Sequence, residues 1–240
     1  MRKKASLYNG QRVLIAPEGK QITRRSLLGT SVGAAALADQ ALAKTFCAST
    51  LVTEPGPFFP VKNMNFAADL AGGHNGGAQA SGKLLYVYGV VRDGQCQPVQ
   101  GARVAIWQAD AEGHYDHPRA EGHDDLDPNF QYFGEIETSE TGFYRFRTIQ
   151  PKSYVAFGLN RAAHIHFRIA APGVETMTTE MYFAGAEHDE RRMNDVVWSS
   201  RPAPARESLI VESMLAVNKS DLGVEAEPGA LACRFDIGLT

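Results

Sequence analysis

Two histidines and two tyrosines are the residues whose types and spacing best suit chemistry in this 240-residue chain. His164 and His166 are two positions apart, so on a strand both side chains lie on one face and can reach one metal ion. Tyr115 and Tyr154 offer phenol oxygens, which are hard, anionic donors when ionised. Because a free phenol has a pKa of about 10, ionising two of them near neutrality needs a highly charged cation. The set indicates a trivalent ion, and ferric iron, Fe(3+), is the one most available to biology.

Both tyrosines are expected where a strand gives way to a loop. In the run 103–108, Val104 and Ile106 alternate with Arg103 and Ala105, which predicts a strand that leads into a Gly-containing turn just before Tyr115. A second strand is predicted over 143–148, and Pro151 then begins a turn before Tyr154. Such positions are where a rigid scaffold presents functional groups.

The rest of the chain predicts an all-β fold. Further strands are expected over 84–91, 164–170, 180–183 and 232–237, with a weaker one over 208–216. Turn signals between short strands favour an antiparallel β-sandwich with long loops and little helix. The Gly- and Ala-rich segment 67–82 predicts a long loop, and the charged segment 187–195 a short helix or a solvated loop.

Several motifs follow one another along most of the chain after residue 43. In order, they are Thr53-Glu-Pro-Gly-Pro-Phe-Phe-Pro60, Ala102-x-Val-x-Ile-Trp-Gln-Ala-Asp-Ala-x-Gly-x-Tyr115, Gly142-x-Tyr-x-Phe-x-Thr-Ile-x-Pro-x-x-Tyr154, Arg161-Ala-Ala-His-Ile-His-Phe167 and Thr179-Glu-Met-Tyr-Phe183. This series resembles the intradiol ring-cleavage dioxygenases, non-heme ferric enzymes that open catechols between their two hydroxyl-bearing carbons. The resemblance implies the prealbumin-like sandwich of that family.

The resemblance also implies a role for each candidate residue. Tyr115, Tyr154, His164 and His166 would ligate Fe(3+), and Tyr154, once displaced by substrate, would act as a base. Arg161 would stabilise negative charge that develops on the substrate ring during oxygen attack. The implied partners are a catechol-type small aromatic and O2, and the implied product is a muconate-type diacid.

Two positions depart from the family's pattern. Ala162 stands where the family usually has proline, a change that loosens the loop rather than removing chemistry. Glu180 stands where the family usually has glutamine near the metal ligands. Its carboxylate could accept a proton, which makes it a catalytic candidate, or repel an acidic substrate unless a cation offsets it.

Two other functions fit parts of the sequence. His164, His166 and Glu180 could hold zinc or another divalent ion in a hydrolase or a cupin-like oxygenase. Alternatively, Gly89–Gly94 and Pro98–Ala102 resemble prealbumin-like strands of secreted binding modules, which need no metal.

The N-terminus predicts export. Thr23-Arg-Arg-Ser-Leu-Leu28 follows a basic region and resembles a twin-arginine signal, and 26–38 is uncharged but too short to span a membrane stably. Ala41-Leu-Ala43 offers a cleavage site. We therefore expect a signal peptide over 1–43 and a single domain over 44–240, exported folded to the periplasm or beyond. The other interpretation is a tail in which the arginine pair has no function.

Charge and cysteine content limit the partners and the redox state. The formal net charge is −3, and without a Lys/Arg run after the N-terminus we expect no nucleic acid and no membrane contact beyond export; a homo-oligomer is left open. In an oxidising compartment the three cysteines, Cys47, Cys96 and Cys233, allow one disulfide with three alternative pairings.

Other conspicuous side chains have structural interpretations. Trp107 is expected in the core. His114, His117 and His123 are expected to be solvated in a polar loop.

Overall fold

The computed structural model describes residues 48–62, 66–72, 77–216 and 221–239. It also describes the backbone of two short antiparallel strands, β1 (Leu7–Tyr8) and β2 (Gln11–Arg12). Apart from these strands, the predicted signal peptide lies outside the described residues, as does Cys47. In the described part of the chain no helix has the length and apolar character needed to cross a membrane.

One five-stranded sheet carries most of the candidate residues. Its strand order is β11 (Ile210–Val211), β10 (Met177–Phe183), β9 (His164–Ala170), β4 (Arg103–Gln108) and β5 (Phe133–Glu137). The central strand β9 pairs antiparallel with both β10 and β4. This register places Glu180 and Trp107 on either side of His166.

The second sheet is built around the nine-residue strand β3 (Leu84–Arg92). On one edge β3 pairs antiparallel with β6 (Phe143–Ile149). On its other edge it pairs in parallel, first with β13 (Leu231–Arg234) and then with β14 (Ile237–Gly238), and β12 (Met214–Leu215) extends the sheet beyond β13.

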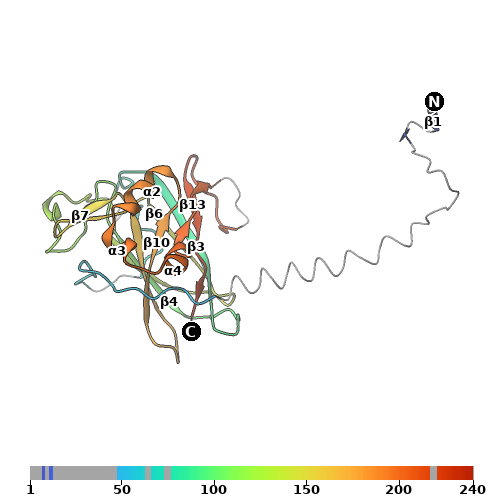
Figure 1. Cartoon of the computed structure of the whole chain (residues 1–240), viewed down its shortest axis with the longest axis horizontal. Coiled ribbons are helices and arrows are strands. Elements are labelled where there is room, and N and C mark those ends of the chain that lie inside the picture. The colour runs from blue at the N-terminus through green and yellow to red at the C-terminus, as the bar shows by residue number, and fades with distance from the viewer. Residues whose placement is uncertain are drawn as a thin grey trace. The chain divides into compact units, whose positions relative to one another are not determined.

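Aromatic contacts join the two sheets across the core. Phe167 of β9 lies 6.1 Å, centroid to centroid, from Tyr144 of β6 and 5.1 Å from Phe235, which follows β13. All three side chains are buried. The predicted all-β sandwich is confirmed (Figure 1). The sheets are mixed, because β10–β11, β3–β13 and β3–β14 are parallel pairs.

A hairpin and three short helices lie beside the first sheet. Strand β7 (Tyr154–Ala156) pairs with β8 (Leu159–Arg161), and both α2 (Ala186–Met193) and α3 (Val196–Ser199) contact β8. Figure 1 shows α2 and α3 next to this hairpin. Within the described residues the other helical elements are α4 (Ala203–Glu207) and the 3-10 turn η3 (His123–Asp125).

The sequence located several elements and missed others. The strands predicted over 103–108 and 164–170 have those bounds, and the charged segment 187–195 forms most of α2. The single strand expected over 232–237 is two strands, and the one expected over 208–216 is two short strands in different sheets. Strand β5 and the β7–β8 hairpin were not predicted.

Two of the three disulfide pairings are wrong. Cys233 is a free, buried thiol, so it is paired with neither of the other two cysteines. Cys96 is disulfide-bonded and adopts a positive φ of 68° in its turn.

Candidate metal centre

His164 and His166 point their ring nitrogens at a common place. Both side chains are buried on the same face of β9, and their Nε2 atoms lie 3.0 Å apart. The Nδ1 of His164 lies 2.6 Å from the Ala162 carbonyl oxygen, so Nδ1 carries the proton and donates it there. The Nε2 of His164 is therefore an available lone pair.

Burial keeps both imidazoles neutral, as metal ligands must be. Burial, followed by the positive charge of Arg161, lowers the pKa of His164 well below its ordinary value. Burial likewise lowers the pKa of His166 to about 4. Two neutral imidazoles with adjacent Nε2 atoms are a ready pair of donors for one ion.

The ring of His166 is held between two neighbouring groups. Trp107, its cross-strand partner on β4, stacks on it with centroids 4.7 Å apart and an interplanar angle of 2°. Gly56 approaches from the segment 53–60, where a Cβ would lie 3.3 Å from His166 Cε1, and its φ of 75° favours glycine. The orientation of His166 is thus fixed by packing.

The two tyrosines meet beside these histidines. The rings of Tyr115 and Tyr154 contact each other edge to face at 5.1 Å, and Tyr154 lies 5.7 Å from His164 between ring centroids. Both hydroxyls are buried, and neither makes a hydrogen bond of normal geometry within the described residues. Buried polar groups are nearly always paired, so two adjacent unpaired hydroxyls call for a missing partner.

Asp110 positions the loops that carry both tyrosines. Its Oδ1 accepts hydrogen bonds from the backbone N–H groups of Glu112 and His114, both at 2.9 Å, which shapes the turn before Tyr115. The backbone N–H of Lys152 donates to the Asp110 carbonyl oxygen at 3.1 Å, two residues before Tyr154. One residue therefore ties together two segments that are far apart in sequence.

Neither tyrosine ionises readily in this environment. Burial raises the pKa of Tyr115 well above its ordinary value, and the neighbouring Tyr154 adds to the rise. Burial also raises the pKa of Tyr154 to about 12, although the positive charge of Arg161 opposes it. Ionising both phenols therefore needs a strong positive charge next to their oxygens, which a bound cation supplies.

Arg161 lies behind Tyr154, its cross-strand partner in the β7–β8 hairpin. The buried guanidinium donates through Nε to Asp195 Oδ2 at 3.2 Å and through Nη2 to Glu180 Oε1 at 3.3 Å and to the Tyr182 hydroxyl at 3.2 Å. Its Nη1 makes none of these bonds. Arg161 is thus fixed beside the two tyrosines with its charge retained.

Glu180 lies on the outer side of His166. Its Oε1 is 3.6 Å from His166 Nδ1, on the opposite side of the ring from Nε2. Its Oε2 accepts from the Tyr182 hydroxyl at 2.7 Å and pairs with Arg201 Nη1 at 2.6 Å. Burial would raise the pKa of Glu180, but the surrounding histidines and arginines outweigh it and hold that pKa well below its usual range.

The same region could be read as a three-residue site of His164, His166 and Glu180, whose candidate ligand atoms lie within 4.8 Å of one another. Both carboxylate oxygens of Glu180, however, already accept from arginines, and Oε2 also accepts from a phenol. We therefore place Glu180 outside the ligand set, with Oε1 3.6 Å from a His166 Nδ1 that makes no hydrogen bond within the described residues.

A protein-family model described as "Dioxygenase" matches residues 55–240, more than half of the chain. The chain belongs to this dioxygenase family. Among its relatives, the protocatechuate 3,4-dioxygenase beta chain of Burkholderia cepacia is 35% identical over 164 residues, 66% of this chain and 65% of that protein. The 6-chlorohydroxyquinol 1,2-dioxygenase of Cupriavidus pinatubonensis is 37% identical over 155 residues, 57% of this chain and 52% of that protein. The chain thus matches about half to two thirds of the length of these relatives.

Solved structures agree with the family assignment. The dioxygenase domain of a carbohydrate-binding fusion protein from Streptomyces sp. SirexAA-E superposes with a TM-score of 0.57 at 25% identity, covering 80% of this chain and 98% of that one. A catechol 1,2-dioxygenase from Acinetobacter sp. ADP1 has a TM-score of 0.61 at 24% identity, covering 89% of this chain and 70% of that one, which shows the shared fold. The family match does not favour a secreted binding module or a zinc hydrolase.

The dioxygenase fold brings together the four residues predicted as ligands, Tyr115, Tyr154, His164 and His166, with Arg161 and Glu180 beside them. Trp107 lies in the core as expected.

The environment predicted for one histidine was wrong. His117, expected to be solvated, is buried with 5% exposure, because its ring packs at 5.6 Å on Phe58, which also contacts both tyrosines.

Three residues of the centre were not predicted: Tyr182, Asp195 and Arg201. Tyr182 lies two positions after Glu180 on β10, so strand alternation alone could have found it. Nothing in the local sequence marks Asp195 or Arg201.

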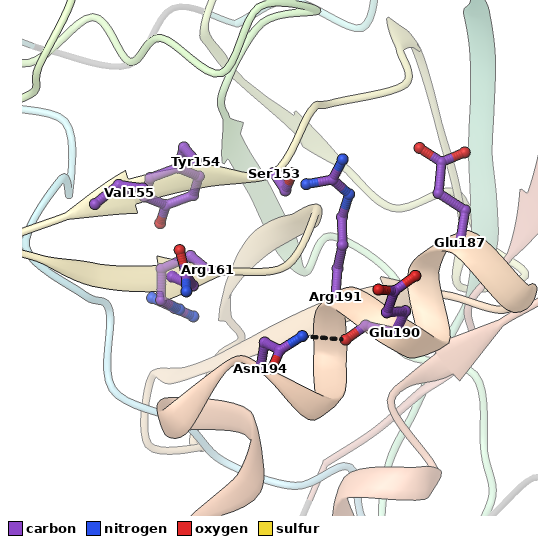
Figure 2. Close-up of a pocket in the computed structure, with 9 residues that line it drawn as sticks. Ser153, Tyr154, Val155, Arg161, Glu187, Glu190, Arg191 and Asn194 are labelled. Carbon is purple, nitrogen blue, oxygen red and sulfur yellow. Dashed lines mark hydrogen bonds between the residues drawn. The ribbon is translucent and has the colours of Figure 1, made fainter.

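A cavity of about 380 Å³ lies beside the centre. Tyr154 and Arg161 form part of its wall from the hairpin, and Glu190 and Arg191 face them from α2 (Figure 2). Its volume is within the range of small-molecule sites.

Proposed function

We propose that this protein is a ferric non-heme dioxygenase that opens a catechol-type ring between its two hydroxyl-bearing carbons with O2, giving a muconate-type diacid. Membership of the dioxygenase family supports the reaction type. Relatives named as protocatechuate, catechol and hydroxyquinol dioxygenases support the substrate class.

One observation carries the proposal. Two buried phenol hydroxyls that make no hydrogen bond of normal geometry with any described residue lie beside two imidazoles whose Nε2 atoms converge. Two neutral nitrogens and two phenol oxygens fit a hard, trivalent cation, because only a high charge would ionise phenols whose pKa values burial has raised. Tyr115, Tyr154, His164 and His166 would hold Fe(3+).

Bound Fe(3+) would supply the Lewis acidity that lowers the pKa of a catechol, and the catecholate so formed would be more reactive toward O2. Tyr154 lies within the donor cluster, and its phenolate oxygen would take a proton from an incoming catechol hydroxyl. Arg161, held by Asp195 and Glu180, would stabilise negative charge that appears on the ring. Phe58 covers both tyrosines and helps to exclude water.

The test is the colour and oxygen uptake of purified protein loaded with iron. A ferric tyrosinate absorbs visible light, so we expect a red protein that consumes O2 with at least one member of a panel of catechol, protocatechuate and hydroxyquinol. Tyr154→Phe and His164→Ala should abolish uptake. Tyr144→Phe is the matched control, because the Tyr144 hydroxyl is also buried but donates to the Phe235 carbonyl. Colourless protein that binds stoichiometric zinc would refute the proposal.

We also propose that residues 1–43 are a twin-arginine signal and that residues 44–240 act outside the cytoplasm. The disulfide at Cys96 supports an oxidising compartment. Replacing Arg24 and Arg25 with lysine should retain the full-length chain in the cytoplasm, whereas the wild-type chain should appear shortened in the periplasm or medium. Equal export of both would refute the signal.

A further inference from the structure

Glu180 puts a negative charge into a position where the dioxygenase family usually has a neutral amide. The side chain is 1% exposed, so its charge cannot be solvated by water. Alone, it would compete for the guanidinium of Arg161 and would add a negative charge next to two phenols that must themselves ionise. A carboxylate at this position needs a second cation.

Arg201 supplies that cation. It lies between α3 and α4, and its Nη1 reaches Glu180 Oε2 at 2.6 Å and the Tyr182 hydroxyl at 3.4 Å. Its side chain is 14% exposed, so this is a largely desolvated ion pair. Arg201 approaches Oε2, whereas Arg161 approaches Oε1. The carboxylate is therefore shared between two arginines, one on each oxygen.

The charged side chains that surround the ligand residues, called here the outer layer, balance one another. Two guanidinium groups, Arg161 and Arg201, face two carboxylates, Glu180 and Asp195. Removing Arg201 would leave Arg161 as the single counter-ion of both acids. Removing the charge of Glu180 would leave Arg201 without its acid.

We propose that Arg201 is a positioning residue of the metal centre, which holds Glu180 against His166 Nδ1 and leaves Arg161 free to keep its place beside Tyr154. This inference rests on the proposed ferric function. Glu180 Oε1 lies 3.6 Å from His166 Nδ1, which makes no hydrogen bond within the described residues, so the carboxylate is the group nearest to that nitrogen's proton. A carboxylate next to a ligating imidazole orients the ring and makes it a stronger donor. Arg201 therefore acts through Glu180 and Tyr182, the two side chains that its Nη1 reaches.

The experiment is a double-mutant cycle with Arg201→Met, Glu180→Gln and the pair together. In metal-free protein, each single variant should lower the midpoint of thermal unfolding, Arg201→Met by about 5–10 °C, because breaking a buried pair leaves an uncompensated charge. The double variant should lose less than the sum of the two single losses. This arm measures the ion pair whether or not the protein is a dioxygenase.

The second arm uses iron-loaded protein and measures iron affinity by chelator competition, together with the position of the visible band. Arg201→Met should weaken iron binding about tenfold and shift the band, as loss of an outer-layer partner does. Arg201→Lys should restore part of both. The matched control is Arg103→Met, which removes a cation from another buried acid, Glu135, at the far end of β4. It should lower stability without changing the band or the iron affinity.

The inference is overturned if the unfolding losses of the two single variants add up to the loss of the double variant. It is also overturned if Arg201→Met has the same visible band and the same iron affinity as wild type. If Arg201→Met alone does not fold, the double variant compared with Glu180→Gln decides: an equal or higher unfolding midpoint for the double variant supports the pair, and a lower one refutes it. A wild-type protein with no visible band but a strongly coupled cycle would refute the ferric function and leave the ion pair standing.

Discussion

Replacing Asp195 is the sharpest test of how the outer layer holds the centre. The side chain is fully buried, and its two oxygens do different work. Oδ2 accepts from Arg161 Nε at 3.2 Å and from the Ala162 backbone N–H at 2.9 Å. Oδ1 caps α3 by accepting from the backbone N–H groups of Val197 and Trp198 at 2.9 and 3.0 Å.

The loss expected for Asp195→Ala follows from these contacts. Breaking a buried ion pair costs about 3–5 kcal/mol, and the lower end applies because Arg161 keeps Glu180 as a partner. Losing the helix cap costs about 1 kcal/mol, and the unpaired Ala162 N–H at least about 1 kcal/mol more. The free energy of unfolding should fall by roughly 5 kcal/mol, which corresponds to a drop of roughly 10–20 °C in Tm for a domain of this size.

Urea unfolding of metal-free protein measures this loss, with an unchanged slope showing that the unfolded state is the same. Asp195→Asn is the matched control: an amide oxygen still caps α3, but the charge that faces Arg161 is gone. With that oxygen at the cap, the amide NH2 group faces the donors of Arg161 and Ala162, so we expect Asp195→Asn to lose only about 1 kcal/mol less than Asp195→Ala. A loss below about 1 kcal/mol for the alanine variant, or equal losses for the two variants, would refute the division of work between the two oxygens.

Two further predictions concern the buried histidines and the glycine that packs on one of them. The pKa of His166 is about 4 in the native state, against an ordinary value of 6.5 in the unfolded chain. As the pH falls below 6.5, the unfolded chain therefore binds a proton at His166 that the native protein does not bind. The stability of metal-free protein should therefore be complete above pH 6.5 and fall by about 3 kcal/mol toward pH 4, with His164 adding to the loss; flat urea midpoints over this window would contradict the burial argument. Gly56→Ala should destabilise by about 1–2 kcal/mol, since alanine is strained at a φ of 75° and its Cβ would press on the His166 ring, and calorimetry that shows no change in Tm would contradict this.

Local pattern was sufficient for the strands that carry the donors. Residues 103–108 and 164–170 were predicted with their observed bounds, because each is a mostly apolar run that ends at turn residues, as expected for strands that are almost fully buried. The spacing of His164 and His166 is a local property of one strand. Tyr115 follows a strand end as expected, whereas Tyr154, expected in a turn, is the first residue of strand β7. The meeting of the two tyrosines could not be read locally.

Strand β5 escaped prediction because glycine interrupts its pattern. Gly134 lies within β5, and a Cβ there would lie 2.5 Å from the Ala67 carbonyl oxygen. The glycine is needed for a close approach by a segment 67 residues earlier in the chain. A glycine in a strand ordinarily signals a break, so the sequence alone gives the opposite indication.

The predicted strand over 232–237 divides for a related reason. Its partner β3 pairs with β13 through Tyr88 and resumes with β14 at Val91. Between them the backbone of Phe235 lies against Gly89, where a Cβ would be 2.1 Å from the Phe235 carbonyl oxygen. The division depends on a contact between residues 146 positions apart, which no window of local sequence contains.

The free-energy cost of a buried charge depends on the charges around it. The effect of a residue such as Glu180 therefore cannot be predicted from its own position in the sequence. Taken alone, Glu180 is an anion beside metal ligands, and elementary electrostatics predicts that it weakens an anionic ligand set. In the folded chain Arg161 and Arg201 approach its two oxygens from positions 19 residues before and 21 residues after it. Neither separation matches a strand or helix period, so the counter-charges are invisible until the chain is folded. A departure from a family's pattern at one buried charged position is therefore best judged together with the charges that the fold brings to it.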